Sequence, residues 1–168
     1  MTRAPTLTTA RLTLRSFVLA DFPDFAACLA SPRSTGMGGP YDVKGAWGLF
    51  CHDIAGWDLF GYGGLAITAT ATGVCMGEIC LSSGPLFPEP ELGWTLYDRF
   101  EGHGFATEAA AAMRDWAFGP RGLTTLVSYC DPDNHRSQAV ARRLGAVEDS
   151  GAPRQDPDDL VFRHRRPA

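Results

Sequence analysis

The residues with the clearest chemical potential lie between Glu91 and Trp116, in the stretch ELGWTLYDRFEGHGFATEAAAAMRDW. A strand-like segment leads into a turn that contains Gly102 and Gly104, and an alanine-rich helical pattern follows it without a break. The first backbone N–H groups of a helix have no intrahelical partner, and glycines let an anion approach them closely. The succession of strand, glycine turn and helix therefore predicts a cradle for a diphosphate.

The residues around this turn favour an anion site. Arg99 lies three positions before Gly102, and no acidic residue follows in the helical pattern until Glu108. Each charge-assisted hydrogen bond to a bound diphosphate contributes roughly 1.5–3 kcal/mol. Glu101 does not fit this pattern, so we expect its side chain to point away from the anion. The alternative is that the two glycines only satisfy the conformation of a turn.

A dinucleotide site of the Rossmann type is a second interpretation of the glycine turn. Its fingerprint requires a small third residue where Thr107 stands, and an acidic residue about 20 positions further on. Asp131, which follows the next strand, lies further away than that. The N-terminal half also predicts consecutive strands rather than alternating strands and helices. A nucleotide-dependent oxidoreductase is therefore the weaker alternative.

The pattern of apolar residues predicts the elements that must position the turn. Residues 11–17 alternate as a strand, and apolar residues at helical spacing follow Asp21. Residues 31–40 form a loop, and Asp42 is a candidate cap for a second helix that holds Trp47 and Phe50. The expected order downstream is strands at 61–70 and 74–82 joined by a turn at 71–73, a strand at 91–97, a helix from Phe105 that stops at Gly119-Pro120, a strand at 123–130, a helix from its cap Asn134 to Leu144 with Gly145 after it, and a hairpin of 147–148 with 160–164.

This order, β-α-α-β-β-β-α-β-α-β-β, predicts a single mixed α/β domain over residues 1–168, with a core at about 7–164. The chain has 168 residues, of which 45% are hydrophobic and 20% charged, which is typical of a soluble globular domain. The net charge of −4 argues against a nucleic-acid partner and favours basic or amine-bearing ones. No apolar run approaches the roughly 18 residues of a membrane span. No signal-peptide core is present either, so we expect a cytoplasmic protein.

The cysteines and histidines do not predict a metal site. The five cysteines are an odd number without C-x-x-C spacing, and we expect them to be reduced and mostly buried. The four histidines form no H-x-H or H-E-x-x-H pair.

Together these residues resemble the GNAT superfamily of N-acetyltransferases. The spacing Arg99-x-x-Gly102-x-Gly104-x-Ala106 is similar to the acetyl-CoA pyrophosphate motif of that superfamily. The resemblance extends over about residues 7–164 and is sharpest to the branch of ribosomal-protein serine and alanine N-terminal acetyltransferases. The segments that carry it are TLTTARLTLRSF, the Asp21 helix, Gly77-Glu-Ile-Cys-Leu81, Glu91-Leu-Gly-Trp94-Thr-Leu96, Gly104-Phe-Ala-Thr-Glu-Ala109 and Asn134-x-x-Ser137…Leu144-Gly145.

The resemblance implies a mostly antiparallel sheet, flanked by helices, in which a central pair of strands splays apart. The strand with Trp94 and Leu96 would leave the 123–130 strand and pair with the pantetheine arm of acetyl-CoA. Asn134 would bond the pantetheine, Ser137 would lie near the sulfur, and Trp47 and Trp57 would help to wall the acceptor side. The diphosphate would be held by the backbone amides of Gly102, His103, Gly104, Phe105 and Ala106, assisted by Arg99 and Thr107. From the residue types alone, Asn134 is equally a helix cap and Trp94 equally a core residue.

The resemblance also implies direct attack of a neutral amine on the thioester. Neutralising a lysine amine at pH 7 costs roughly 4–5 kcal/mol, whereas an α-amine costs about 1 kcal/mol. We expect Glu91, at the start of the splayed strand, to act as the general base. Many members of the family protonate the thiolate with a tyrosine at the position of Ala141, so here we assign that proton to Ser137.

Two questions stay open at the level of sequence. A protein that binds or senses acyl-CoA without catalysis would keep the same cradle, because a fold does not fix an activity. The amine acceptor is a protein N-terminus, an aminoglycoside, a polyamine or an amino acid. We expect a monomer or a homodimer.

Overall fold

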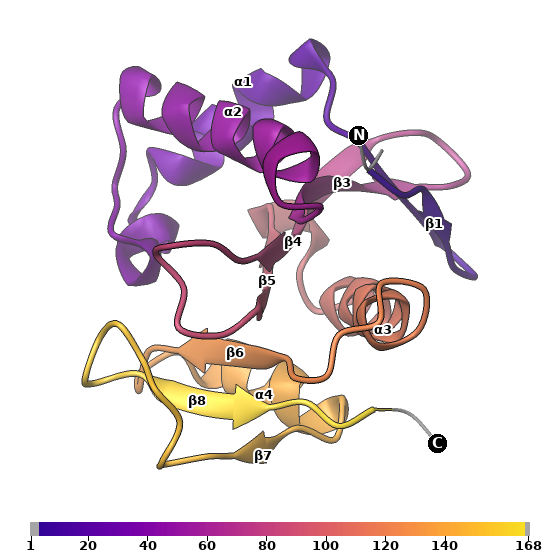
Figure 1. Cartoon of the computed structure of the whole chain (residues 1–168). Helices are drawn as coiled ribbons and strands as arrows, with labels where there is room; N and C mark the ends of the chain where they lie inside the picture. The colour runs from indigo at the N-terminus through magenta and orange to yellow at the C-terminus, as the bar shows by residue number, and fades with distance from the viewer. Residues whose placement is uncertain (1–3, 167–168) are drawn as a thin grey trace.

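An eight-stranded sheet, ordered β1-β2-β3-β4-β5-β6-β8-β7, runs through the computed structural model, which describes residues 4–166 (Figure 1). The mixed α/β architecture that the sequence predicts is confirmed. The strands are β1 (Leu7–Thr8), β2 (Leu12–Arg15), β3 (Gly63–Ala69), β4 (Cys75–Ser82), β5 (Glu91–Leu96), β6 (Val127–Cys130), β7 (Val147–Glu148) and β8 (Leu160–Arg163).

Four α-helices and three 3-10 turns connect these strands. The α-helices are α1 (Phe22–Leu29), α2 (Val43–Leu59), α3 (Phe105–Phe118) and α4 (His135–Arg143). The 3-10 turns are η1 (Leu19–Asp21), η2 (Pro32–Met37) and η3 (Asp98–Phe100).

The predicted caps account for where the helices begin and end. The Asp42 carboxylate accepts a hydrogen bond of 2.7 Å from the Gly45 N–H at the start of α2. The Asn134 side chain accepts one of 3.1 Å from the Ser137 N–H at the start of α4. Gly145 follows α4 with a φ of 77°, a left-handed conformation that glycine adopts without steric cost.

Two predictions of local structure were wrong. The strand expected over 123–130 begins only at Val127, because the Leu123 N–H donates to the Ala117 carbonyl and closes the chain back onto the end of α3. The loop expected over 31–40 contains η2, whose first turn is capped by the Ser31 hydroxyl. The short strand β1, which pairs with β2, was not predicted because two residues are too few to show a period.

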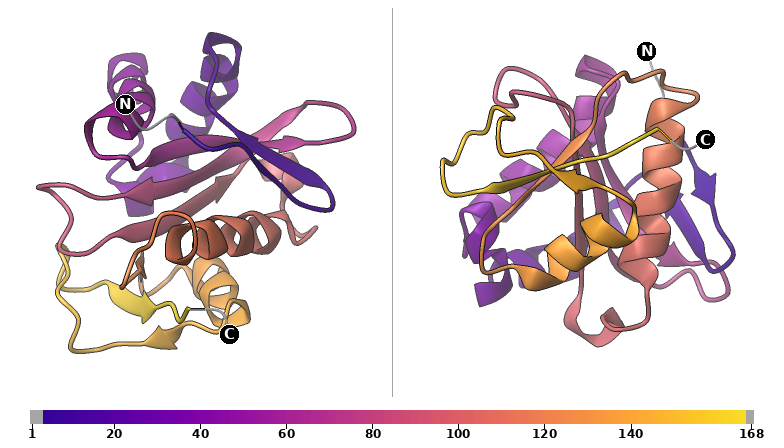
Figure 2. Two further views of the ribbon diagram at one scale, coloured as in Figure 1. Left: turned by 45° about the vertical axis from the view of Figure 1, so that its right-hand side comes forward. Right: turned by 90° about the horizontal axis from the view of Figure 1, so that it is seen from below.

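Helices cover both faces of the sheet (Figure 2). On one face, aromatic residues of α1 and α2, Phe25 and Phe50, pack with Ala66 of β3. On the other face, Met113 of α3 packs with Leu65 and other strand residues whose side chains alternate with those of the first face. The face of α3 that carries Met113 is therefore the face that contacts the sheet.

The pairing of β5 with β6 is the one feature of the sheet that bears directly on a binding site. Every other pair of neighbouring strands is antiparallel, whereas β5 and β6 run parallel and are in register only at Glu91 and Val127. Beyond this point the two strands diverge, as Figure 1 shows. The splayed strand pair is thus present, and the largely antiparallel sheet argues against the Rossmann alternative.

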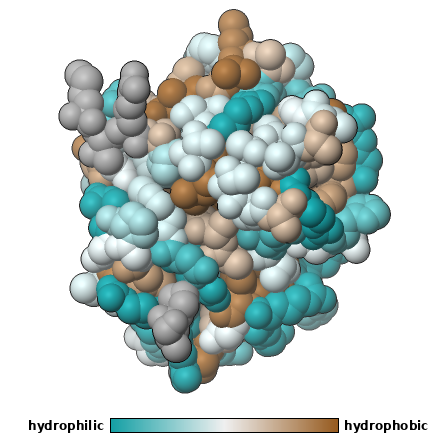
Figure 3. All heavy atoms as spheres, turned by 90° about the vertical axis from the view of Figure 1, so that its right-hand side faces the viewer, coloured by the Kyte–Doolittle hydropathy of each residue, from teal (hydrophilic) through white to brown (hydrophobic). Residues whose placement is uncertain are grey.

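The outer surface is unremarkable on the face drawn in Figure 3, where hydrophilic and hydrophobic residues are interspersed. Within residues 4–166, no helix combines the length and the apolar composition that crossing a membrane requires.

Candidate functional site

The start of α3 presents a row of unpaired backbone donors. Gly102 and Gly104 have φ values of 79° and 80°, so both lie in the left-handed region that favours glycine. Across the described residues, none of the six backbone N–H groups from Gly102 to Thr107 donates a hydrogen bond. A β-carbon at position 102 would have no atom within 4 Å. The turn therefore combines free donors with open space, which fits a diphosphate.

The first strands of the chain support this turn from behind. Arg11 donates a hydrogen bond of 3.0 Å to the His103 carbonyl, and its guanidinium lies 4.5 Å from the centre of the Phe105 ring. Arg11 also pairs with the Glu108 carboxylate at 2.7 Å, and Thr9 donates to the same carboxylate. The negative charge of Glu108 in the first turn of α3 is therefore balanced by Arg11. The contact of Arg11 with the turn was not predicted, because Arg11 lies far from the turn along the chain.

The carboxylate of Glu101 is held by arginines on two other elements. Arg33 of η2 and Arg136 of α4 both form ion pairs with it, and these pairs lower the pKa of Glu101, Arg33 having the larger effect. This agrees with the expectation that Glu101 does not compete for the anion site. Arg33 also donates a hydrogen bond of 2.9 Å to the Leu96 carbonyl at the end of β5. Arg33 and Arg136 were missed because their role depends on tertiary contacts.

The opening between β5 and β6 exposes the backbone of β5. The Tyr97 N–H donates to the Met76 carbonyl on the β4 side, whereas the Leu92 carbonyl faces β6. Since successive residues of a strand alternate in direction, the N–H and carbonyl of Trp94 face the opening. The side chain of Trp94 is half-buried in the core, and that of Leu96 is buried. These residues can therefore offer a ligand their backbone groups.

A buried serine and histidine close the inner end of this opening. The Ser128 hydroxyl donates a hydrogen bond of 2.5 Å to the Leu92 carbonyl and lies 2.8 Å from Nε2 of His164. Burial lowers the pKa of His164 to about 4, so its imidazole is neutral at pH 7. Because the Ser128 hydroxyl donates its proton to the Leu92 carbonyl, it can only accept from His164. The neutral imidazole therefore carries its proton on Nε2 and donates it to the serine oxygen. Neither residue was predicted, as both look like ordinary strand residues.

Glu91 lies at the same inner end, as the first residue of β5. Burial and the negative charge of Asp159 raise its pKa to about 7. A β-carbon at Gly93 would lie 4.0 Å from Oε1 of Glu91 and within 4 Å of no other atom. The carboxylate therefore adjoins open space and can exchange a proton near neutral pH, as a general base must.

The remaining predicted residues lie at the mouth of the opening. Asn134 uses its side-chain oxygen as a helix cap, which leaves its amide N–H donors free, and Ser137 follows in the first turn of α4. The ion pair of Arg136 with Glu101 ties this turn to the glycine turn. Arg99 is exposed, with its guanidinium 4.8 Å from the centre of the Phe100 ring.

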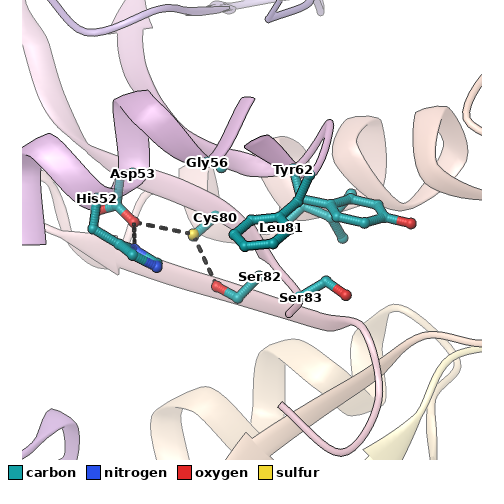
Figure 4. A pocket seen from close by; sticks show the side chains of 10 residues that line it. His52, Asp53, Gly56, Tyr62, Cys80, Leu81, Ser82 and Ser83 are labelled. Carbon is teal, nitrogen blue, oxygen red and sulfur yellow. Dashed lines mark hydrogen bonds and ion pairs between the residues drawn. The ribbon is translucent and has the colours of Figure 1, made fainter. Parts of the chain in front are cut away.

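The two tryptophans that the resemblance places on the acceptor side both pack against other residues of the fold. Trp57 is buried and donates a hydrogen bond of 2.9 Å to the Gly64 carbonyl, and Trp47 packs against Phe22 and Phe50. Neither tryptophan lines the pocket under the C-terminal half of α2 (Figure 4). The residues that line this pocket are His52, Asp53, Gly56, Phe60, Tyr62, Gly63, Cys80, Leu81, Ser82 and Ser83.

Comparison with known proteins connects this geometry to a family. A stretch of 55 residues is 31% identical to the uncharacterized N-acetyltransferase YnaD of Bacillus subtilis. The match spans 33% of this chain and 32% of that protein, so the curated relatives are matched over about a third of their length.

Similarity to solved structures extends over nearly the whole chain. An acetyltransferase from Agrobacterium tumefaciens is 56% identical, with a TM-score of 0.94, over 98% of this chain and 96% of that one. RimL, a ribosomal L7/L12 α-N-protein acetyltransferase solved with coenzyme A, shares the fold with a TM-score of 0.72 at 16% identity. That match covers 95% of each chain.

The family itself follows from the match of a domain model to most of the chain. The model describes the acetyltransferase (GNAT) domain, and it matches residues 11–147, which include the glycine turn, the splayed strands and α4. The chain therefore belongs to the GNAT acetyltransferase family.

Proposed function

We propose that the protein transfers the acetyl group of acetyl-CoA to a primary amine. The observation that carries this proposal is the row of six unpaired N–H groups from Gly102 to Thr107, at the mouth of the opening between β5 and β6. Membership of the GNAT family supports acetyl-CoA as the donor, and the RimL neighbour was solved with coenzyme A.

The donor site uses groups that the fold leaves unpaired. The amides of residues 102–107 hold the diphosphate, and Arg99 adds positive charge at the edge of the turn. The backbone N–H and carbonyl of Trp94 and the N–H of Leu96 pair with the pantetheine arm along the opening, and the free amide of Asn134 binds the same arm. The inner end, closed by the Ser128 hydroxyl, fixes the depth to which the arm enters.

The acceptor chemistry centres on Glu91. Acetyl-CoA supplies an acyl carbon activated as a thioester: the amine nitrogen bonds to it while the carbon–sulfur bond breaks. Glu91 takes the proton that the amine loses, and its pKa of about 7 leaves enough ionised carboxylate at neutral pH to do so. The open space beside Gly93 lets the amine lie between the carboxylate and the thioester.

The leaving thiolate requires a proton of its own. Ala141 is buried against Cys130 and Phe162, so the position used by a tyrosine in many family members carries no acid here. We assign the proton to Ser137, whose hydroxyl makes no hydrogen bond among residues 4–166 and lies in the first turn of α4.

Release of the free thiol in the presence of acetyl-CoA and a panel of amines tests the proposal. The expected result is thiol release that requires an amine, with a mass increase of one acetyl group on the acceptor. Tight binding of acetyl-CoA without release by any protein N-terminus, amino acid, aminoglycoside or polyamine would contradict catalysis. That outcome would leave an acyl-CoA-binding protein.

A further inference from the structure

Three acidic side chains gather on the face of the sheet that α1 and α2 cover. In the pairing of β4 with β5, Ser82 lies opposite Glu91, Cys80 opposite Gly93 and Glu78 opposite Thr95. Residues two apart in a strand share a face, so Glu78, Cys80, Ser82 and Glu91 all project to the same side. Asp53 belongs to α2, the helix that packs on this side of the sheet. Glu91 is therefore one end of a continuous polar row.

The contacts within this row are close. Oδ1 of Asp53 lies 3.7 Å from Sγ of Cys80, and that sulfur lies 3.1 Å from the Ser82 hydroxyl (Figure 4). The acidic oxygens of Asp53 and Glu78 and the Cys80 sulfur all lie within 4.8 Å of one another. We call Asp53, Glu78 and Cys80 the acid cluster.

The acid cluster has no strong cation to balance it. Elsewhere in the described chain, four buried or partly buried carboxylates are paired with arginine: Asp21 with Arg15, Glu89 with Arg163, Glu101 with Arg33, and Glu108 with Arg11. Over residues 4–166, Asp53 pairs only with His52, at 3.5 Å, and neither Glu78 nor Glu91 has an ion pair. Buried charges are normally paired, so three acids on one face without arginine or lysine either keep a proton or take a cation from outside the chain.

One oxygen of the cluster is unused. Oε1 of Glu78 is buried and has no hydrogen-bond partner in the part of the chain that the structure describes. The backbone makes room for it at Gly64, where a β-carbon would lie 2.5 Å from this oxygen and 2.9 Å from Cβ of Asp53. A buried acceptor without a donor is costly, so it marks a place for a donor.

We propose that the acceptor is a diamine or polyamine whose second ammonium group binds at the acid cluster while its reacting amine lies at Glu91. This proposal rests on the proposed function and names the class of its substrate. Phe60 and Tyr62 line the same pocket as Asp53 and Cys80, and they supply an apolar surface for a hydrocarbon chain. An ammonium group donates three hydrogen bonds, which suits the carboxylate oxygens of Asp53 and Glu78.

Matched amines test the proposal with the unmodified protein. Putrescine and n-butylamine have the same hydrocarbon chain and differ by one ammonium group. With acetyl-CoA at saturation, we expect putrescine to have a kcat/KM at least roughly tenfold higher, because a charge-assisted hydrogen bond at a desolvated site is worth that much or more. Equal values for the two amines would overturn the proposal.

Substitutions in the acid cluster test whether the advantage of putrescine over n-butylamine arises there. Asp53→Asn and Glu78→Gln should remove most of the putrescine advantage through KM, while the turnover of n-butylamine and the affinity for acetyl-CoA stay unchanged. Asp58→Asn is the matched control, since Asp58 is exposed on the same helix and does not line the pocket. A loss that is equal for both amines would assign the acid cluster a structural role and overturn the proposal.

A binding measurement separates this inference from the proposed function. Calorimetry of putrescine with protein saturated by coenzyme A should show binding that n-butylamine lacks, whether or not acetyl transfer occurs. If amines are acetylated but putrescine has no binding advantage, only the substrate class fails. If purified protein holds zinc that Cys80→Ser releases, the acid cluster is a metal site and the proposal fails.

Discussion

Gly93 keeps open the space that the Glu91 carboxylate faces. A β-carbon built at position 93 meets Oε1 of Glu91 at 4.0 Å and no other atom within that distance. Positions 91 and 93 face the side of β5 that α1 and α2 cover, and they lie at the point where β5 leaves β6. An acid with a pKa of about 7 thus borders a gap at the inner end of the splayed strands.

This relationship predicts that Gly93→Ala separates activity from stability. Gly93 has no positive φ, so alanine fits the backbone, and the loss of glycine freedom in the unfolded chain should stabilise the fold by about 0.4–1 kcal/mol. The added methyl group occupies the space where amine and thioester meet, and we expect kcat/KM to fall at least tenfold. Thermal unfolding and initial rates check the two effects.

Gly48→Ala is the control for Gly93→Ala. It adds a methyl group with no atom within 4 Å, on the exposed side of α2, and should change the rate little. A Gly93→Ala protein that is stable and fully active would show that the gap is not where the reaction occurs.

The glycine turn predicts a loss of donor binding on Gly104→Glu. Position 104 has a φ of 80°, and a glutamate there adds a negative charge to the row of free N–H groups. We expect the Kd for acetyl-CoA to rise by more than 100-fold in calorimetry. Gly73→Glu, at a φ of 72° in the turn between β3 and β4, imposes the same backbone strain away from the site. Comparable weakening in both variants would attribute the effect to strain.

Glu78, which has no ion pair, and Glu89, which is paired with Arg163, should have opposite effects on the free energy of unfolding. Burial and the neighbouring Asp53 raise the pKa of Glu78, so Glu78 destabilises the fold increasingly as pH rises above about 4.5, the value in the unfolded chain. Glu78→Gln should therefore stabilise the protein at pH 8 by about 1–3 kcal/mol, and less at pH 5. Thermal unfolding at the two pH values measures this, at ~2–4 °C per kcal/mol.

Glu89→Gln is the counterpart of Glu78→Gln. Its ion pair with Arg163 lowers the pKa of Glu89, so this acid stabilises the fold above about pH 4.5 and loses that effect as pH falls through its lowered pKa. The variant should lower the melting temperature at pH 8. A decrease for Glu78→Gln as well would mean that Glu78 has a partner that balances its charge.

The sequence was sufficient to predict elements whose signals are local. The caps Asp42 and Asn134 and the left-handed Gly145 follow from residue types within a few positions of one another. The splay of β5 from β6 came from family resemblance, because no periodicity within a strand reports which neighbour it leaves.

The supporting residues of the site could not be predicted for a physical reason. Arg11, Arg33 and Ser128 act through contacts with residues distant in sequence, and each resembles an ordinary surface or strand residue in its local context. The raised pKa of Glu91 likewise depends on burial and on Asp159, neither of which is visible from the flanking residues. The burial of Trp57 and its hydrogen bond to the Gly64 carbonyl are also tertiary features that its neighbours in the sequence do not report.

In the proposed reaction Glu91 accepts the proton of the attacking amine, and the pH dependence of kcat/KM measures this step. An alkylamine acceptor ionises near pH 10, well above the pKa of about 7 of Glu91, so a break in the profile near pH 7 belongs to the enzyme. We expect the wild-type rate to rise with pH and to show this break. Glu91→Gln should lose the break and at least 100-fold in rate, with an unchanged Kd for acetyl-CoA. A variant profile that keeps both the break and the rate would show that Glu91 is not the base.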